Sequence, residues 1–268
     1  SSLGWNNPYI ISIFLSSCIL LILFVYYERQ HKTPLIEIAL FKNKVFSASI
    51  LILFGNYACI TTIAFWALWL EQVLNFSPLM SGVALLPAGI PYIFTSRIGG
   101  KLYDRYGAKI PLLIGSILFL VGFLEMAFVA LTMQYLWFMF GMLLAGLGWG
   151  FVRPCAILSA LNSVPASHKS MATGMISTMR QLGAAVGFAL VYAIISTFQH
   201  VFSSKIIQQE NLHITINQLN QLVTATAKHQ AQDYLIPLVK MAHTDAFSLG
   251  LAGISVLAIL NLVLVIKY

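Results

Sequence analysis

The sequence predicts an all-α, polytopic membrane protein with seven transmembrane helices, and three observations lead to this fold class. First, 59% of the 268 residues are hydrophobic, 9% are charged and the mean hydropathy is +0.85, whereas about 25% of the residues of a soluble domain are charged. Second, the apolar residues form runs of the roughly 20 residues that a helix needs to cross a bilayer. Third, the basic residues gather between these runs.

The seven apolar runs give the expected helices in chain order. They lie at about 8–27, 45–70, 80–102, 110–131, 134–161, 170–198 and 246–267. The third contains Pro87 and Pro91, which each remove a backbone donor and predict a kink. Strands of a membrane barrel would be shorter and would alternate in polarity, so the runs indicate helices.

Charge predicts the orientation of the chain in the membrane. Cytoplasmic loops are enriched in Lys and Arg, and residues 1–7 and the turns after the second and fourth helices contain neither. The opposite face carries Arg29, Lys32, Lys42, Lys44, Arg97, Lys101, Arg105, Lys109 and Lys169. We therefore expect the N-terminus of this chain outside and its C-terminus in the cytoplasm, which an odd number of spans allows.

The segment 199–245 is polar and interrupts this pattern. We expect an external loop with short amphipathic helices, and we expect its histidines to be solvated. It contains Lys205, Lys228 and Lys240, and four of the six histidines: His200, His213, His229 and His243. No two of these histidines are three or four residues apart, so the sequence predicts no metal site here.

Several function classes are excluded or disfavoured by the sequence. The net charge of +7 is better explained by topology than by nucleic-acid binding. Cys18, Cys59 and Cys155 lie in apolar runs without CxxC spacing, which predicts buried free thiols. The chain has no HExxH, GxSxG or channel-filter pattern. We therefore predict neither an enzyme nor a cofactor.

The turn between the third and fourth helices carries the most informative motif, GGKLYDRYGAK at 99–109. Glycines permit close helix approach and tight reversal, an aspartate can meet the positive N-terminus of an adjacent helix, and basic residues hold the turn at the cytoplasmic surface. The motif residues are Gly100, Leu102, Asp104, Arg105, Gly107 and Lys109. The alternative interpretation is a basic turn that only sets topology.

This motif resembles the loop signature that transporters of the major facilitator superfamily carry after the second helix of each six-helix half. The stretches EQVLNFSPLMSGVALLPAG (71–89), GLGWGFVRPCAILSALNSVP (146–165) and ATGMISTMRQLGAAVGFAL (172–190) resemble 14-span drug:proton antiporters of the EmrB/QacA type. The resemblance implies that 45–268 form the C-terminal six-helix bundle. It also implies that 1–44 form an extra span and a cytoplasmic linker, and that the N-terminal half lies elsewhere.

The resemblance further implies a function. We expect part of a multidrug exporter in a cell membrane, the bacterial inner membrane, that exchanges small lipophilic or cationic solutes for protons by alternating access. Its partners would be membrane lipid and the N-terminal half of the same transporter. The alternative is a non-transporting membrane subunit, or a transporter of another small solute that must pair with such a half.

Small residues mark expected helix contacts. Gly146 and Gly150 on the fifth helix, and Gly183 and Gly187 on the sixth, are each spaced four residues apart. This spacing lets helix backbones approach closely in the bilayer. The sequence does not separate static packing from sliding during transport.

Polar and aromatic groups inside the spans give the candidate solute pathway. Ionisable groups near the middle of a span cost about 2.5–3.5 kcal/mol on the insertion scale. We expect the pathway at Asn56, Tyr57, Thr61, Trp66 and Arg180. Arg180 would line the cytoplasmic side of the pathway, or would lock the fifth and sixth helices through a carboxylate or backbone carbonyl groups. The alternative for Arg180 and for Arg153 is a side chain that reaches the inner interface. Trp66 and Trp69 could instead belong to an interfacial aromatic belt.

Overall fold

The structure is a computed structural model that describes residues 8–30, 38–209 and 235–268. All regular structure in these ranges is helical. The helices are α1 (Pro8–Gln30), α2 (Lys44–Ile60), α3 (Ile63–Gln72), α4 (Pro78–Ala84), α5 (Leu86–Tyr106), α6 (Lys109–Val129), α7 (Tyr135–Asn162), α8 (Lys169–Gln209) and α10 (Leu235–Lys267). Three short 3₁₀ helices join them: η1 (Ile38–Lys42), η2 (Ala130–Thr132) and η3 (Ala166–His168).

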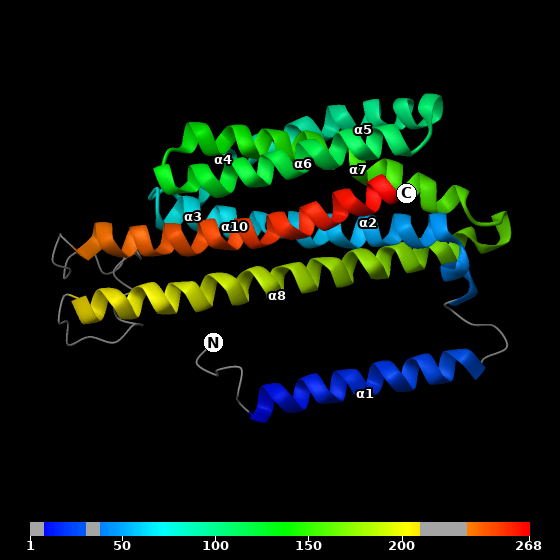
Figure 1. Cartoon of the computed structure of the whole chain (residues 1–268), viewed down its shortest axis with the longest axis horizontal. Helices are drawn as coiled ribbons and strands as arrows, with labels where there is room; N and C mark the ends of the chain where they lie inside the picture. The colour runs from blue at the N-terminus through cyan, green and yellow to red at the C-terminus, as the bar shows by residue number, and fades with distance from the viewer. Residues whose placement is uncertain (1–7, 31–37, 210–234) are drawn as a thin grey trace.

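Six helical segments of the described residues are long and apolar enough to cross a membrane. They are Lys44–Gln72, Pro78–Tyr106, Lys109–Thr132, Tyr135–Asn162, Ala166–Gln208 and Pro237–Lys267, and each corresponds to a predicted run. The remaining run forms α1, whose apolar stretch Ile11–Leu20 is shorter. Helix α1 stands apart from the other helices (Figure 1), and Phe14 and Leu20 on it are exposed. A spanning role for α1 stays a prediction.

The second predicted helix is broken into two helices. Helix α2 ends at Ile60 and α3 begins at Ile63. The hydroxyl group of Thr62 donates a 2.7 Å hydrogen bond to the carbonyl oxygen of Cys59. Such back-bonding by Ser and Thr competes with the helical ladder and bends helices. The break divides this span into α2 and α3.

The third predicted helix is interrupted where its prolines predict a change of direction. Helix α4 ends at Ala84, and Pro87 occupies the first turn of α5, where its missing N–H is tolerated. Pro91 lies inside α5, and the hydroxyl group of Thr95 donates to the Pro91 carbonyl oxygen at 2.9 Å.

The prediction of a polar loop over the whole of 199–245 is wrong. Helix α8 continues to Gln209 and α10 starts at Leu235. His243 is buried, and its Nδ1 atom donates to the Val239 carbonyl oxygen at 2.8 Å. Lys240 Nζ donates to the Val73 carbonyl oxygen at the end of α3, also at 2.8 Å. His213, His229, Lys228 and Lys32 lie outside the described residues.

The six spanning segments form a bundle in which α5 and α8 have the most free surface. Helix α7 packs between α5 and α6, while α2 and α10 pack against each other and against α8 (Figure 1). Pro78–Tyr106 and Ala166–Gln208 are the least buried spans. Only 22% and 17% of the residues in their most apolar stretches are buried. An apolar surface of this size on a membrane bundle faces lipid or another bundle.

Glycines allow close approach in two of these contacts. A Cβ atom at Gly146 or Gly150 would overlap Ala88 or Thr95 on α5. A Cβ atom at Gly183 or Gly187 on α8 would overlap the carbonyl oxygen of Phe54 or Ala58 on α2. The structure therefore places all four glycines at helix–helix contacts, and a larger side chain would separate the helices there.

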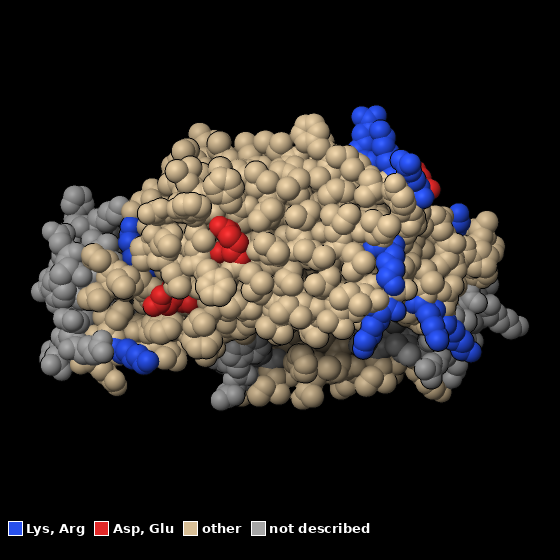
Figure 2. All heavy atoms as spheres, turned by 45° about the horizontal axis from the view of Figure 1, so that its top comes forward, with Lys and Arg blue, Asp and Glu red and all other residues tan. Residues whose placement is uncertain are grey.

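Most Lys and Arg side chains gather at one end of the bundle, and a largely uncharged surface separates this end from the other (Figure 2). This end holds the start of α2, the α5–α6 turn and the start of α8 (Figure 1). The exposed basic residues of these segments are Lys42, Lys44, Arg97, Lys101, Arg105, Lys109 and Lys169.

Gly107 should be sensitive to any side chain. It ends α5 with φ +77° and ψ −175°, and its N–H donates to the Tyr103 carbonyl oxygen. That conformation is essentially restricted to glycine and costs other residues about 1–3 kcal/mol. Gly107→Ala should therefore lower the melting temperature of the detergent-solubilised protein. Gly82→Ala, in a helix with no atom within 4 Å of the added Cβ, should raise it slightly or leave it unchanged. Equal melting temperatures for the two variants would contradict the strained turn.

Candidate functional site

A cluster of two arginines and three aromatic rings lies at the middle of the bundle. Tyr57 is at the centre of the span Lys44–Gln72, and Tyr92 is at the centre of Pro78–Tyr106. Trp149 lies beside the centre of Tyr135–Asn162. Since each ring is central in its own helix, the three helices bring them to one depth. Arg153 and Arg180 complete this group, which we call the midspan cluster.

Arg153 is held by aromatic side chains from three helices. Its Nη1 atom donates a 2.7 Å hydrogen bond to the hydroxyl oxygen of Tyr92. The guanidinium carbon lies 5.6 Å from the Tyr92 ring centre, 5.7 Å from that of Trp149 and 5.9 Å from that of Tyr57. Tyr92 and Trp149 are themselves in contact, with ring centres 4.6 Å apart. Cation–π attraction within about 6 Å therefore holds this charge among three rings.

Arg180 approaches the same ring of Tyr57 from α8. Its guanidinium carbon lies 4.6 Å from the Tyr57 ring centre. The Nε atom is buried and has no hydrogen-bond partner. Arg180 lies 14 residues after Ala166, the start of its span, or about 21 Å of helix at 1.5 Å per residue. The expected lock through a carboxylate or backbone carbonyl groups is absent from the described part of the chain, and the aromatic ring replaces it.

The two charges are not neutralised within the described ranges. Neither Arg153 nor Arg180 forms an ion pair with a described carboxylate; the Tyr92 hydroxyl and the rings are their polar neighbours. Each side chain is only partly buried. Because an unpaired charge inside a membrane is costly, this arrangement favours a group that arrives from outside the bundle and carries negative charge or accepts hydrogen bonds.

Only part of the predicted pathway lies in this cluster. The structure brings Tyr57 and Arg180 together. Asn56 is fully buried, with both polar atoms of its amide unpartnered among the described residues. The hydroxyl group of Thr61 donates to the carbonyl oxygens of its own helix at Tyr57 and Ala58.

Trp66 lies in the core and not on the open face. It is fully buried, and its ring centre is 5.8 Å from that of Phe123 and 6.3 Å from that of Phe138. Trp69 is also buried and stacks on Phe247 at 5.5 Å. This burial does not fit the alternative of an aromatic belt in contact with lipid.

Sequence reasoning missed Tyr92 and Trp149. A usable signal was present, because both are aromatic residues at the midpoints of their apolar runs, as Tyr57 is. The pairing of Arg153 with Tyr92 was not visible, because these residues are 61 positions apart.

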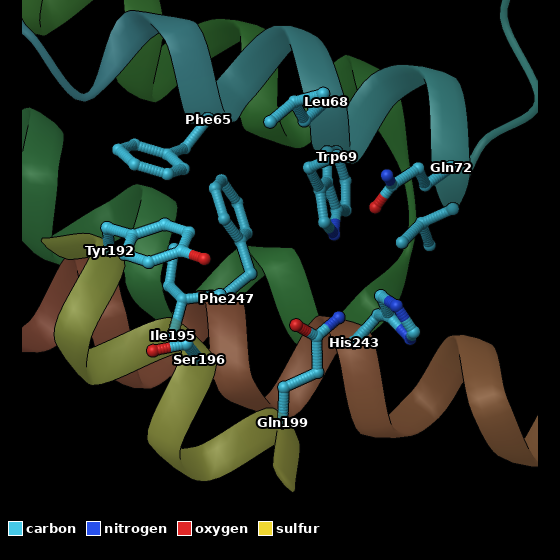
Figure 3. Close-up of a pocket in the computed structure, with 11 residues that line it drawn as sticks. Phe65, Leu68, Trp69, Gln72, Tyr192, Ile195, Ser196, Gln199, His243 and Phe247 are labelled. Atoms are coloured by element: carbon cyan, nitrogen blue, oxygen red, sulfur yellow. The ribbon is translucent and has the colours of Figure 1, made fainter. Parts of the chain in front are cut away.

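A second feature is a pocket of about 280 Å³ between α3, α8 and α10, in the part of the bundle opposite the basic end (Figure 1). Figure 3 shows the rings of Phe65, Trp69, Tyr192 and Phe247 around it, with Gln199 and His243 on the far side. The buried Nε1 atom of Trp69 has no hydrogen-bond partner in the described residues. A lining of rings with a few polar groups is typical of sites for small apolar molecules.

The predicted turn motif lies at the basic end of the bundle. Asp104 and Arg105 occupy the last turn of α5 and are exposed, and Gly107 makes the reversal. The close helix approach expected at Gly100 is instead at Gly99: a Cβ atom at Gly99 would lie 3.3 Å from Phe151 Cα, while one at Gly100 would have no atom within 4 Å. Leu102 is partly buried and Lys109 is exposed.

Glu125 is an acidic residue inside the span Lys109–Thr132. It packs against Gly141 of α7, and its Oε2 atom is buried without a hydrogen-bond partner. No hydrogen bond or ion pair joins Glu125 to α10 in the described part of the chain. The residue lies on α6, away from the midspan cluster on α2, α5, α7 and α8.

Comparisons with known proteins agree with this architecture. The family described as Major Facilitator Superfamily matches residues 1–188. The multidrug resistance protein Stp of Mycobacterium tuberculosis is 26% identical over 197 residues, covering 73% of this chain and 36% of that protein. The quinolone resistance protein NorB of Staphylococcus aureus is 27% identical over 206 residues, covering 75% of this chain and 44% of its own length.

Two further comparisons bear on length and fold. The multidrug transporter protein MdtP of Bacillus subtilis is 28% identical over 197 residues, with 72% of this chain and 36% of that protein covered. The chain thus spans well under half the length of these relatives. A crystal structure of a bacterial homolog of the human lysosomal transporter Spinster, in an inward-facing and occupied conformation, matches with a TM-score of 0.54 at 14% identity. The matched region covers 84% of this chain and 48% of the Spinster homolog, and the match supports the helical fold described above.

Proposed function

The chain belongs to the major facilitator superfamily, and from this premise we propose that it is the C-terminal half of a multidrug exporter of the 14-span drug:proton antiporter type. The observation that carries the proposal is the midspan cluster, which places two charges and three rings on helices of one bundle at the depth where such carriers bind solutes. An N-terminal bundle would close the site from the other side.

The coverage of the relatives supports the idea of a half. The chain matches 36% of Stp and of MdtP, and its two least buried spans, at α5 and α8, leave a surface that a second bundle can cover. We propose that the two bundles rock around the midspan cluster and expose it to each side of the membrane in turn, in exchange for protons.

The site favours lipophilic solutes. The three rings of the midspan cluster provide one apolar contact surface. The four rings of the pocket between α3, α8 and α10 provide a second one at another depth. Two arginines repel a positive charge at the midspan cluster, so the cationic solutes expected from the sequence would have to keep their charge away from it. The basic end of the bundle supports a cytoplasmic C-terminus and an external N-terminus in a bacterial inner membrane.

Transport by the paired halves tests the proposed function. The chain is produced in bacterial membranes alone and together with an N-terminal half of seven spans, which brings the total to 14. Accumulation of neutral, cationic and anionic fluorescent lipophilic solutes is measured with and without a proton gradient. We expect the pair, and not the chain alone, to lower accumulation of at least one solute. Equal accumulation with and without the pair, at matched membrane levels, would contradict the proposal.

The alternative is a membrane subunit that pairs with a half but does not transport. The observation that fits it is the free apolar surface of α5 and α8, which a partner half would cover. Co-purification of the pair without any gradient-dependent change in accumulation would support this alternative over an exporter.

We propose that Asp104 contacts the opposing bundle and stabilises one of the two states of the carrier. Its carboxylate is exposed and makes no hydrogen bond or ion pair with a described residue, so its loss should not weaken this bundle. A carboxylate at a helix N-terminus is worth up to about 1–2 kcal/mol. Asp104→Asn should therefore lower transport by the pair about fivefold or more at unchanged membrane level. Glu71→Gln, at the opposite end, is the matched control. Normal transport by Asp104→Asn would remove the turn from the mechanism.

A further inference from the structure

We propose that the midspan cluster binds an aromatic carboxylate, with the acid group between Arg153 and Arg180 and the ring system against the aromatic side chains. The inference rests on the proposed function and gives it a substrate class. It goes against the expectation of cationic solutes, because the observations that carry it are positive charges and ring faces.

The charge balance is the first argument. Two guanidinium groups approach the single ring of Tyr57, at 5.9 Å and 4.6 Å from its centre. Like charges on one ring repel each other, and neither has a carboxylate partner among the residues that the structure describes. Each guanidinium group is partly buried, and an unpaired charge inside a membrane-spanning segment is costly. An anion held between Arg153 and Arg180 would remove both penalties at once.

The free donors are the second argument. The Nη1 atom of Arg153 is committed to the Tyr92 hydroxyl oxygen at 2.7 Å, which fixes the plane of that guanidinium. The Nε atom of Arg180 is buried and unpartnered. Guanidinium groups pair with carboxylates through parallel N–H···O bonds, and Arg153 keeps its Nε and Nη2 donors for such a pair while Nη1 stays on the Tyr92 hydroxyl.

The rings specify the rest of the ligand. Tyr92 and Trp149 are in contact at 4.6 Å, and both lie beside Arg153. Offset or edge-to-face ring contacts are worth about 0.5–1.5 kcal/mol beyond the buried area. A flat aromatic group attached directly to a carboxylate would add ring contacts to the charge contact, whereas an alkyl carboxylate would make the charge contact alone.

A set of probes with one ring system and different charges tests this substrate class. Radiolabelled 2-naphthoate, 2-naphthamide and 2-naphthylmethylammonium carry the same rings with a negative, neutral and positive group, and octanoate carries the acid without rings. Binding is measured in nanodiscs of uncharged phosphatidylcholine, with the chain alone and paired with an N-terminal half. We expect 2-naphthoate to bind the pair at least about tenfold more tightly than the other three probes.

Substitutions locate the binding group. Arg153→Gln and Arg180→Gln should each weaken 2-naphthoate binding about tenfold or more and should leave 2-naphthamide binding within about twofold. Arg153→Lys and Arg180→Lys should lose less, because they keep the charge and lose only the forked geometry. The control is Arg97→Gln, an exposed arginine at the basic end. If the glutamine variants do not fold, the charge series on the unmodified protein still decides the question.

Three results would overturn the proposal. One is tighter binding of the cation or the amide than of the acid. Another is 2-naphthoate binding to the chain alone that disappears in the pair, which would mean that a carboxylate of the other bundle occupies the arginines. The third is loss of 2-naphthoate binding when phosphatidylglycerol replaces part of the lipid, which would assign the arginines to lipid headgroups. Transport of other solutes by a pair that shows no preference for the acid would refute this inference and leave the proposed function standing.

Discussion

Gly187→Val will separate α8 from α2 and strongly destabilise the bundle. The three heavy atoms nearest to a Cβ added at Gly187 all belong to the backbone of Ala58, and backbone atoms cannot move aside as the end of a flexible side chain can. Overpacking of this kind costs about 1–3 kcal/mol and sometimes more. The contact cannot be replaced by hydrophobic association, because lipid is as apolar as the helix surface.

The measurement is the temperature at which the detergent-solubilised protein loses its monodisperse peak in size-exclusion chromatography. A cost of 2–3 kcal/mol lowers the midpoint by roughly 5–10 °C for a chain of this size. Gly174→Val is the matched control on the same helix, because a Cβ at Gly174 has no atom within 4 Å. Equal midpoints for Gly187→Val and Gly174→Val would show that α2 and α8 are not in close contact in the membrane.

The sequence was sufficient to predict the helices and the reversal after α5. Length and hydropathy decide whether a segment can cross a bilayer, and Gly107 lies at the turn where a positive φ is needed. The ends of the helices were less predictable. His243 and Lys240 are polar in sequence, but hydrogen bonds to the carbonyl oxygens of Val239 and Val73 keep them on α10. Such bonds depend on helix geometry and on neighbours that the sequence does not show.

The candidate site was only partly predictable, because sequence gives the helical phase and not the neighbour on each face. Tyr57 and Trp66 are nine residues apart, which at 3.6 residues per turn puts them on opposite faces of a continuous helix. The structure packs Trp66 against Phe123 of α6 and leaves Tyr57 beside the arginines. Both residues are aromatic side chains inside the same apolar run, and only tertiary packing shows which of them lies in the core and which in the site.

Tyr57→Ala should have the largest effect of any substitution of a ring in the midspan cluster. Its ring is the one contact that Arg153 and Arg180 share. Each cation–π contact is worth about 0.5–2 kcal/mol, the upper value applying where water is excluded. Without the Tyr57 ring, both guanidinium groups lose this cation–π contact and can then turn toward water or lipid headgroups. We expect transport by the paired halves to fall by about tenfold or more, at 1.4 kcal/mol per factor of ten.

Two further variants separate the role of the ring from general damage. Tyr57→Phe keeps the ring face and removes only the hydroxyl group, so it should recover most of the transport lost in Tyr57→Ala. Tyr26→Ala removes an exposed tyrosine from α1 and controls for the substitution itself. The readout is initial transport rate against solute concentration, since a looser site should raise KM more than it lowers the maximal rate. If Tyr57→Phe transports as poorly as Tyr57→Ala, the hydroxyl group and not the ring face is required. The cation–π geometry would then have no part in solute binding.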